Sequence, residues 1–148
     1  SERYCFNGKG AMQTGIQRLP LKDGAEAVYY FNEEGVMQTG KQTIYDEDLE
    51  ENQTWYFNVK GSQKGQGYHG VRDNQIYVNG LLQKADPELR YEAVSLGEKT
   101  YLINTSGNIQ KASSSSTSSA RPELGKGFKD IKDTNDTVWT VDSSGIIQ

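Results

Sequence analysis

Cysteine and histidine are scarce in this sequence of 148 residues, which contains one of each. The single thiol, Cys5, has no partner for an internal disulfide, and it leaves the redox compartment open. Cys5 and His69 lie too far apart for their spacing to indicate a nucleophile–base pair or a zinc site. We therefore expect no catalytic residues, no metal site and no cofactor, although a longer parent protein would leave room for a catalytic domain elsewhere.

The sequence also lacks a basic field and a long apolar run. Lysine and arginine number 16 against 20 aspartates and glutamates, and the formal net charge is -4, so nucleic acid is a poor candidate partner. No apolar run approaches the length of a bilayer, so we expect no membrane insertion, and no signal peptide is evident. Apolar residues make up only 34% of the chain, which leaves tyrosine and tryptophan to supply much of the buried surface.

What the chain does contain is a short β-hairpin pattern at residues 29–40. Tyr29, Tyr30 and Phe31 favour a strand, and the side chain of Asn32 can bond the backbone of a turn. Gly35 follows three residues later, where such a turn needs a left-handed position. Residues 36–38 then form the returning strand.

The rest of the chain repeats this pattern more or less closely. The further copies are 4–15, 55–61, 101–110, 139–148 and a shortened copy at 76–83, in which Asn79-Gly80 is suited to a type I′ turn. Glycines 10, 35, 61, 80, 107 and 145 are assigned to the turns. Linking strands are expected at 16–19, 41–44, 68–71, 91–94 and 128–131.

Self-similarity at this period predicts an all-β fold: an elongated β-solenoid of stacked hairpins. We assign hairpin repeats to 1–111, a Ser-rich loop or linker to 112–120, and a final repeat, continuing the same solenoid, to 121–148. The serine run at 113–119 cannot bury apolar surface and is expected to be mobile. The acidic run at 46–51 lacks the glycine and ligand spacing of a calcium loop, so we interpret it as a solvated insertion. Because the chain begins just before one repeat and ends inside another, we expect it to be a piece of a longer protein.

Alternation along a strand sorts each hairpin into two faces. One face is uniformly large and apolar, and we expect it to pack inward: Tyr4 with Phe6, Tyr29 with Phe31, Trp55 with Phe57, Ile76 with Val78, Tyr101 with Ile103, and Trp139 with Val141. The position between is variable, and we expect it to face solvent: Cys5, Tyr30, Tyr56, Tyr77, Leu102 and Thr140.

The pattern Tyr-Tyr-Phe-Asn-x-x-Gly-x-Met-Gln-Thr-Gly at 29–40, nearly matched at 4–15, resembles the cell-wall-binding repeats of secreted bacterial proteins. That family includes choline-binding repeats, and it is similar to glucan-binding repeats and to the receptor-binding repeats of bacterial toxins. The resemblance implies a β-solenoid, a secreted protein at the bacterial cell surface, and non-catalytic attachment to wall polysaccharide or another glycan.

The choline-binding version encloses a quaternary ammonium between tryptophans by cation–π attraction. Here the first tryptophan place holds Arg3, Val28 and Thr54, and the second holds Ile16 and Lys41. These departures disfavour choline in the first repeats. An aromatic returns to the second place in later repeats, and only Tyr68 is flanked by aromatics expected to face outward in both neighbouring hairpins.

We therefore place the candidate ligand site around Tyr68. The candidate residues are Tyr56, Tyr68, Tyr77, Tyr30, His69 and Tyr91, where aromatic faces would stack on a sugar. The competing interpretation is that each tyrosine packs within the array and that His69 is an ordinary loop residue. On that interpretation the chain is a structural spacer or a protein-interaction and adhesion arm without a small ligand. The sequence leaves the oligomeric state open.

Overall fold

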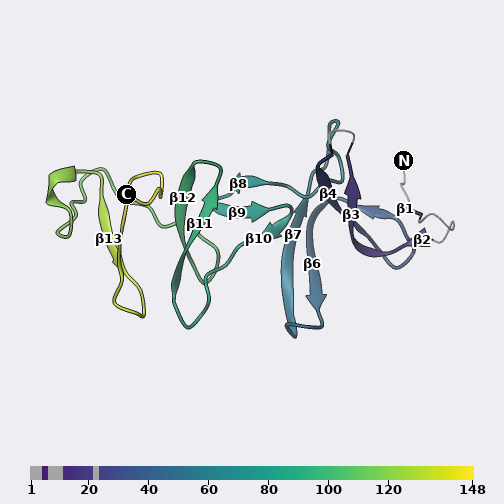
Figure 1. Ribbon diagram of the computed structural model, residues 1–148, viewed down its shortest axis with the longest axis horizontal. Coiled ribbons are helices and arrows are strands. Elements are labelled where there is room, and N and C mark those ends of the chain that lie inside the picture. Colours follow the sequence, from purple (N-terminus) through teal and green to yellow (C-terminus); the bar gives the residue numbers. More distant parts are fainter. Residues whose placement is uncertain (1–4, 7–11, 22–23) are drawn as a thin grey trace. The chain divides into compact units, whose positions relative to one another are not determined.

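The computed structural model of the protein describes residues 5–6, 12–21 and 24–148, and these form strands joined by turns and loops (Figure 1). The strands are β1 (Cys5–Phe6), β2 (Met12–Gln13), β3 (Gly15–Pro20), β4 (Glu26–Phe31), β5 (Met37–Gln38), β6 (Gly40–Asp46), β7 (Glu51–Phe57), β8 (Gly70–Arg72), β9 (Gln75–Val78), β10 (Leu81–Leu82), β11 (Tyr91–Leu96), β12 (Lys99–Asn104), β13 (Lys129–Lys132) and β14 (Val138–Val141). One 3-10 helix, η1 (Pro122–Leu124), precedes β13, and no α-helix occurs among the described residues. The all-β expectation is confirmed, and stacking into a solenoid stays a prediction.

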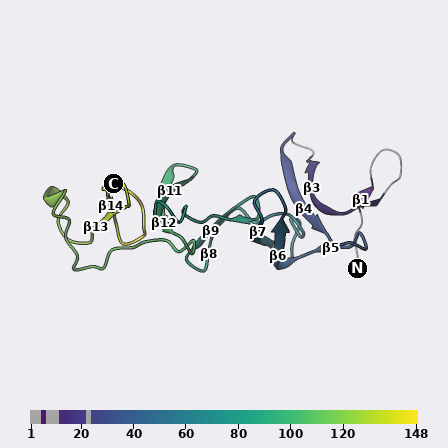
Figure 2. The same cartoon turned by 90° about the horizontal axis from the view of Figure 1, so that it is seen from below.

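The strands form several small antiparallel sheets. A three-stranded sheet has the order β3-β4-β5, and a five-stranded sheet has the order β6-β7-β10-β9-β8. The remaining sheets are the pairs β1-β2, β11-β12 and β13-β14. The β11–β12 hairpin can be followed in both ribbon views (Figure 1, Figure 2).

The longest pairings join each linking strand to the strand after it, which differs from the hairpin expected at 29–40. β3 pairs with β4 over six positions, from Gly15↔Phe31 to Pro20↔Glu26, whereas the returning strand β5 meets β4 at only two. β6 and β7 pair over seven positions. The linking strands are thus half of the main hairpins, because their apolar–polar alternation continues for longer than that of the returning strands.

The turn expected after Phe31 forms through the side chain of Asn32. Its Oδ1 accepts hydrogen bonds from the backbone N–H groups of Glu34 and Val36, at 3.0 and 2.9 Å. Gly35 takes a φ of 81° and donates its N–H to the Asn32 carbonyl oxygen at 2.9 Å. Asn104 and Asp142 organise the same turn in later hairpins, so an amide and a carboxylate oxygen perform one role.

Two turn assignments had different outcomes. The type I′ turn at Asn79-Gly80 is confirmed, because both residues have positive φ (49° and 97°) and Val78 pairs directly with Leu81. The prediction that Gly61 closes the turn of its hairpin was wrong. Gly65 instead donates its N–H to the Asn58 carbonyl oxygen at 2.7 Å, so this turn is longer than the one at Asn32.

The chain divides into two compact units, each with its own core. Unit 1 comprises Ser1–Gly70 and Tyr77–Leu82, and unit 2 comprises Val71–Ile76 and Gln83–Gln148. The core of unit 1 contains Val28, Trp55 and Phe57, packed against by Ile16, Tyr30, Ile44 and Leu81. The core of unit 2 contains Leu102, Ile131 and Val141, packed against by Tyr91, Trp139 and Ile147. The boundaries expected at 111 and 120 stay predictions.

The inward face is buried at most of its described positions, and the other face is not uniformly exposed. Phe57, Ile76, Ile103 and Val141 are each 0% exposed on the inward face. On the other face, Tyr77, Leu102 and Thr140 are also buried, so the expectation that they face solvent was wrong. Leu102 is covered because Ile131 and Val141, from the following hairpin of unit 2, pack against it.

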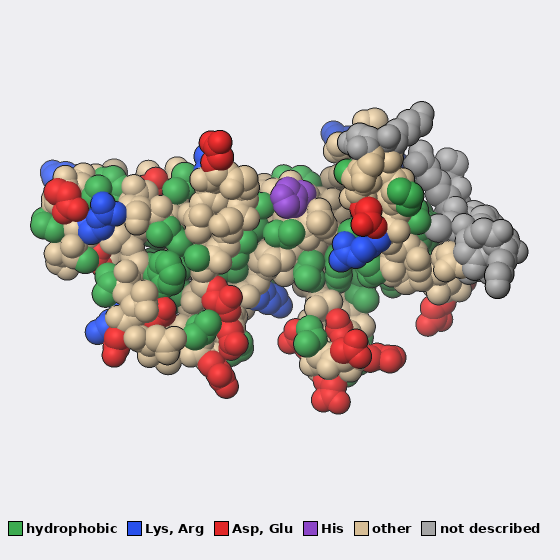
Figure 3. Space-filling view, viewed as in Figure 1, with side chains coloured by type: hydrophobic (Ala, Val, Ile, Leu, Met, Phe, Trp, Pro, Cys, Tyr) green, Lys and Arg blue, Asp and Glu red, His purple; other side chains and the backbone are tan. Residues whose placement is uncertain are grey.

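The two polar insertions differ in structure. The acidic run forms the tip of the β6–β7 hairpin, where Glu47, Asp48 and Glu50 are exposed and acidic side chains gather (Figure 3). The Ser-rich segment, whose role as a separate loop or linker stays a prediction, contains one buried polar side chain. Ser118 is only 2% exposed, because its hydroxyl is hydrogen-bonded to Asp130 on β13.

Candidate functional site

Three tyrosines of unit 1 lie together, as their positions around Tyr68 suggested. Tyr56 comes from β7, Tyr77 from β9, and Tyr68 from the loop before β8. Their ring centroids are 5.9 Å (Tyr56–Tyr68), 6.0 Å (Tyr56–Tyr77) and 6.2 Å (Tyr68–Tyr77) apart, and the rings are steeply inclined to one another. The two pairs that involve Tyr68 are edge-to-face, and such pairs stabilise packing beyond the area that they bury, whereas Tyr56 and Tyr77 are tilted by 56°. Tyr77 is 3% exposed, whereas Tyr56 and Tyr68 are half-buried, so the three rings pack largely on each other.

The backbones of Tyr56, Tyr68 and Gly80 are joined by a closed ring of three hydrogen bonds. Tyr56 N–H donates to the Gly80 carbonyl, Gly80 N–H to the Tyr68 carbonyl, and Tyr68 N–H to the Tyr56 carbonyl, each at 2.8 Å. The approach leaves no room for a side chain at Gly67, where a Cβ would overlap the Asn79 carbonyl oxygen. This backbone ring fixes where Tyr68 stands relative to Tyr56.

A cavity of about 330 Å³ opens beside Tyr68 in unit 1. Its lining consists of one aromatic, one imidazole, several amides, one carboxylate and small residues: Tyr68, His69, Asn58, Gln63, Gln66, Asn79, Glu26, Ala27, Val28 and Gly67. Neither Tyr56 nor Tyr77 lines it. Of the three tyrosines, only Tyr68 lines the cavity. Tyr56 and Tyr77 contact the Tyr68 ring and hold it in place.

His69 has a defined hydrogen-bonding state at the cavity. Its Nδ1 accepts a hydrogen bond from the Asn79 backbone N–H at 3.3 Å. A nitrogen that accepts cannot carry the proton, so in the neutral imidazole the proton resides on Nε2. His69 is exposed, and Nε2–H is the donor that it offers to a ligand.

The other two candidate tyrosines lie elsewhere. Tyr30 stacks on Phe57 with a centroid distance of 6.1 Å and an interplanar angle of 21°, as part of the unit 1 core. Tyr91, on β11, packs against the core of unit 2. Neither lines the cavity beside Tyr68. Their contact with a ligand stays a prediction that the observed packing does not favour.

Sequence reasoning missed the amides of the cavity, and it missed Glu26. Asn58, Gln63 and Gln66 belong to the long turn that closes at Gly65. Because the sequence analysis ended this turn at Gly61, it gave Gln63 and Gln66, which follow that glycine, no structural role. The available signal was the clustering of amide side chains directly before Tyr68.

Among the described residues, two carboxyl groups, both in unit 2, have a lowered pKa. The Ser118 hydroxyl, the Ala120 backbone N–H and two further hydroxyls lower the pKa of Asp130 to about 2. The Trp139 indole N–H and backbone donors of the turn lower the pKa of Asp133. Both groups accept structural hydrogen bonds as carboxylates. Over the described residues, no group of three or more His, Cys, Asp and Glu side chains is arranged to hold a metal ion, and no helix is long and apolar enough to span a membrane.

No protein-family model matches the sequence, and a search of curated proteins finds no match. Among solved structures, the chain is similar to CbpJ from Streptococcus pneumoniae TIGR4, with a TM-score of 0.46 and 20% identity over 99% of this chain and 56% of that one. It is also similar to CbpF, solved in complex with ipratropium by soaking, with a TM-score of 0.42 and 17% identity over 98% of this chain and 42% of that one. Because both scores lie below 0.5, the functional conclusion depends on the chain's own residues.

Proposed function

We propose that the protein is a non-catalytic binding module that attaches a bacterial surface protein to cell-wall polysaccharide or another glycan. The observation that carries this proposal is the cavity beside Tyr68, where one held aromatic ring meets several amides and an imidazole. Sugars suit such a lining, because their C–H faces stack on a ring while their hydroxyls exchange hydrogen bonds with amides. The repeat pattern at 29–40, with its resemblance to cell-wall-binding repeats, supports the same function.

Four polar side chains of the cavity have a role in this proposal. Amide side chains both donate and accept, so Gln63 and Asn58 can satisfy either polarity of a sugar hydroxyl. His69 offers an Nε2–H donor, and Glu26 offers an acceptor. We further propose that the hairpins stack as a solenoid, in which neighbouring repeats complete each other's buried faces.

A second candidate ligand is a quaternary ammonium group such as choline. It is favoured by the aromatic ring of Tyr68 and by the carboxylate of Glu26, which both line the cavity. It is disfavoured by the burial of Tyr77, which leaves this ring little surface to serve as a cage wall. A neutral glycan is therefore the preferred ligand.

The test measures binding of the full chain to purified wall polysaccharide, with free choline as a competitor. Tyr68→Ala is expected to weaken binding by about tenfold, the effect of losing one stacking contact. The matched control is Tyr45→Ala, which removes an exposed tyrosine from the β6–β7 hairpin, away from the cavity. Because Tyr68 also packs on its neighbours, Gln63→Ala provides an exposed cavity variant expected to fold normally.

The outcomes separate the candidates. Weakened binding in Tyr68→Ala and Gln63→Ala, but not in Tyr45→Ala, supports the glycan site. Complete displacement of the polysaccharide by choline would replace the glycan with the ammonium ligand. Absence of saturable binding to both ligands would favour a structural spacer or adhesion arm.

A further inference from the structure

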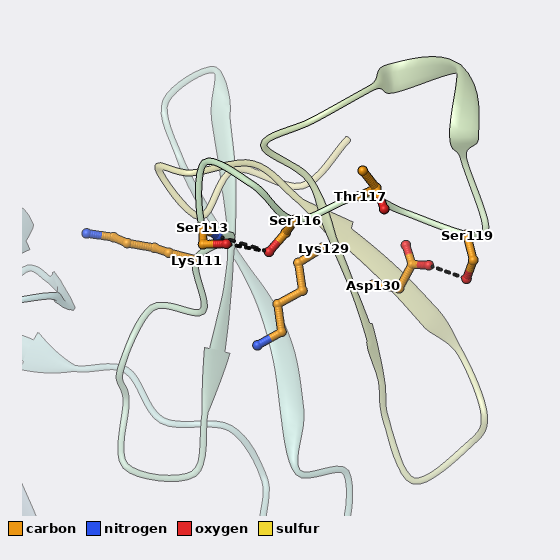
Figure 4. Close-up of a pocket in the computed structure, with 7 residues that line it drawn as sticks. All are labelled: Lys111, Ser113, Ser116, Thr117, Ser119, Lys129 and Asp130. Carbon is orange, nitrogen blue, oxygen red and sulfur yellow. Dashed lines mark hydrogen bonds between the residues drawn. The ribbon is translucent and has the colours of Figure 1, made fainter.

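The Ser-rich loop of unit 2 borders a second, larger cavity. It has a volume of about 530 Å³ and is lined by Lys111, Ser113, Ser116, Thr117, Ser119, Lys129 and Asp130 (Figure 4). The lining contains no aromatic and no apolar side chain, in contrast to the cavity beside Tyr68. A ligand here would be held by hydrogen bonds and charge, without stacking.

The hydroxyl groups form one wall. The Ser113 and Ser116 hydroxyl oxygens lie 2.7 Å apart and hydrogen-bond to each other (Figure 4). The Ser116 carbonyl accepts from the N–H groups of Gly127 and Phe128, at 2.7 and 3.2 Å, which anchors the loop to the segment before β13. Each hydroxyl has one hydrogen and two lone pairs, so the Ser113–Ser116 pair keeps capacity for a ligand.

The one carboxylate of the lining is occupied by the protein. Asp130 Oδ1 accepts from the hydroxyls of Ser118 and Thr140, the latter at 3.0 Å. Its Oδ2 accepts from the Ser119 hydroxyl at 3.1 Å and the Ala120 N–H at 3.0 Å. These four donors occupy both carboxylate oxygens, so Asp130 is engaged with the protein and is not an acceptor aimed at a ligand.

The two lysines have no such partners. Arg121 pairs with Glu123 and Lys132 with Asp136, but neither Lys111 nor Lys129 forms an ion pair with any residue that the structure describes. Lys129 precedes Asp130 on β13, and its ammonium points away from that carboxylate (Figure 4). Lys111 extends away from the loop in Figure 4, on a flexible stem that can turn toward a bound anion.

We propose that this cavity is a second ligand site, which binds an oxyanion carried on a hydroxyl-rich ligand such as an acidic sugar. Lys129 and Lys111 supply the positive charge, and the hydroxyls of Ser113, Ser116 and Thr117 hydrogen-bond to the anion or to its neighbouring hydroxyls. The site is independent of the proposed glycan cavity, because every lining residue belongs to unit 2. Its selectivity comes from charge, and that of the unit 1 cavity comes from an aromatic face.

The test titrates the full chain, labelled with nitrogen-15, with three probes: inorganic phosphate, trigalacturonate and neutral maltotriose. We expect saturable amide shifts around Ser113 and Lys129 with an anionic probe, and none there with maltotriose. Lys111→Ala/Lys129→Ala is expected to weaken the anionic affinity by about twofold to thirtyfold, as for two exposed ion pairs. The matched control is Lys84→Ala/Lys99→Ala, which removes two exposed lysines of the same unit outside the cavity.

Binding of trigalacturonate alone would assign the site to an acidic glycan, and binding of phosphate as well would assign it to oxyanions in general. Equal losses in the two double variants would overturn the proposal, because they would reflect only total charge. So would the absence of shifts around Ser113 with both anionic probes. Failure of the unit 1 glycan test would leave these outcomes unchanged.

Discussion

At the scale of single residues, the side chains that matter most are fixed by hydrogen bonds that cross from one strand or loop to another. Asp130 joins the Ser-rich loop to β13 and β14 through four donors. His69 is held by the backbone of Asn79. In both cases a polar side chain performs the ordering that an apolar core performs in larger proteins, which suits a chain with little apolar content.

We predict that Asp130→Asn lowers the stability of unit 2 in a pH-dependent way. The folded-state pKa of about 2 lies below the usual aspartate value, so the carboxylate stabilises the fold fully above about pH 4 and loses this effect as the pH falls toward 2. Urea unfolding measured from pH 7 to pH 2 should show the wild type more stable than the variant at neutral pH and the two converging in acid. Asp136→Asn is the control, since its exposed ion pair with Lys132 contributes little. A gap between Asp130→Asn and wild type that stays constant down to pH 2 would contradict this role.

The sequence predicted that the three tyrosines lie close together, but it did not predict how far each side chain is buried. Tyr56 and Tyr77 occupy the same place in successive hairpins, Tyr68 begins the linking strand between them, and this spacing is visible in the sequence. Alternation along β9 assigned Tyr77 to the solvent face, but the rings of Tyr56 and Tyr68 cover it. Coverage by a neighbouring element is a tertiary property that a single strand does not encode.

At the scale of elements, the recurring turn is the most predictable part of the fold. Asn32, Asn104 and Asp142 each place a side-chain oxygen against two backbone N–H groups. This chemistry is local, so the sequence shows it. The sequence did not predict the long turn from Asn58 to Gly65. Two glycines, Gly61 and Gly65, lie in this segment, both have positive φ, and either could have ended the turn. The sequence also did not predict that the linking strands form the longest pairings, because the length of a pairing depends on the partner strand as well as on the strand itself.

We predict that the turn at Asn104 tolerates aspartate and not alanine. Asn104→Asp keeps the Oδ1 that accepts from Ser106 and Asn108, at 3.0 and 2.9 Å, and should change the free energy of unfolding by less than about 0.5 kcal/mol. Asn104→Ala removes both bonds and should cost about 1–3 kcal/mol. Thermal and urea unfolding of the two variants provide the measurement. Equal destabilisation by Asp and Ala would show that the side-chain oxygen is not what holds the turn.

At the scale of the whole molecule, the described residues form a small core in each of the two units. Each core contains three buried residues with partly buried neighbours around them, and the two cores share no residue. The sequence indicated an elongated array of stacked hairpins, and that stacking stays a prediction. It did not indicate where the chain divides, because the division passes through β8 and β9, where the pattern is continuous.

We predict that a substitution in the core of one unit destabilises mainly that unit. Leu102→Ala removes a side chain that is 0% exposed and should cost about 2–5 kcal/mol in unit 2. Phe57→Ala, also at 0% exposure, should cost about 3–5 kcal/mol in unit 1. Hydrogen exchange followed by mass spectrometry should show faster exchange in peptides of the altered unit. Equal acceleration throughout the chain in both variants would indicate a single cooperative structure.

The ring of main-chain bonds among Tyr56, Tyr68 and Gly80 uses no side-chain atom, so it places no demand on sequence beyond small residues where the backbones meet. A segment that closes in this way can be copied in tandem within a gene, and the new copy can join its neighbour without compensating changes elsewhere. Its aromatic and polar positions are then free to diverge after duplication, and one ancestral segment can give rise to descendants that recognise different ligands.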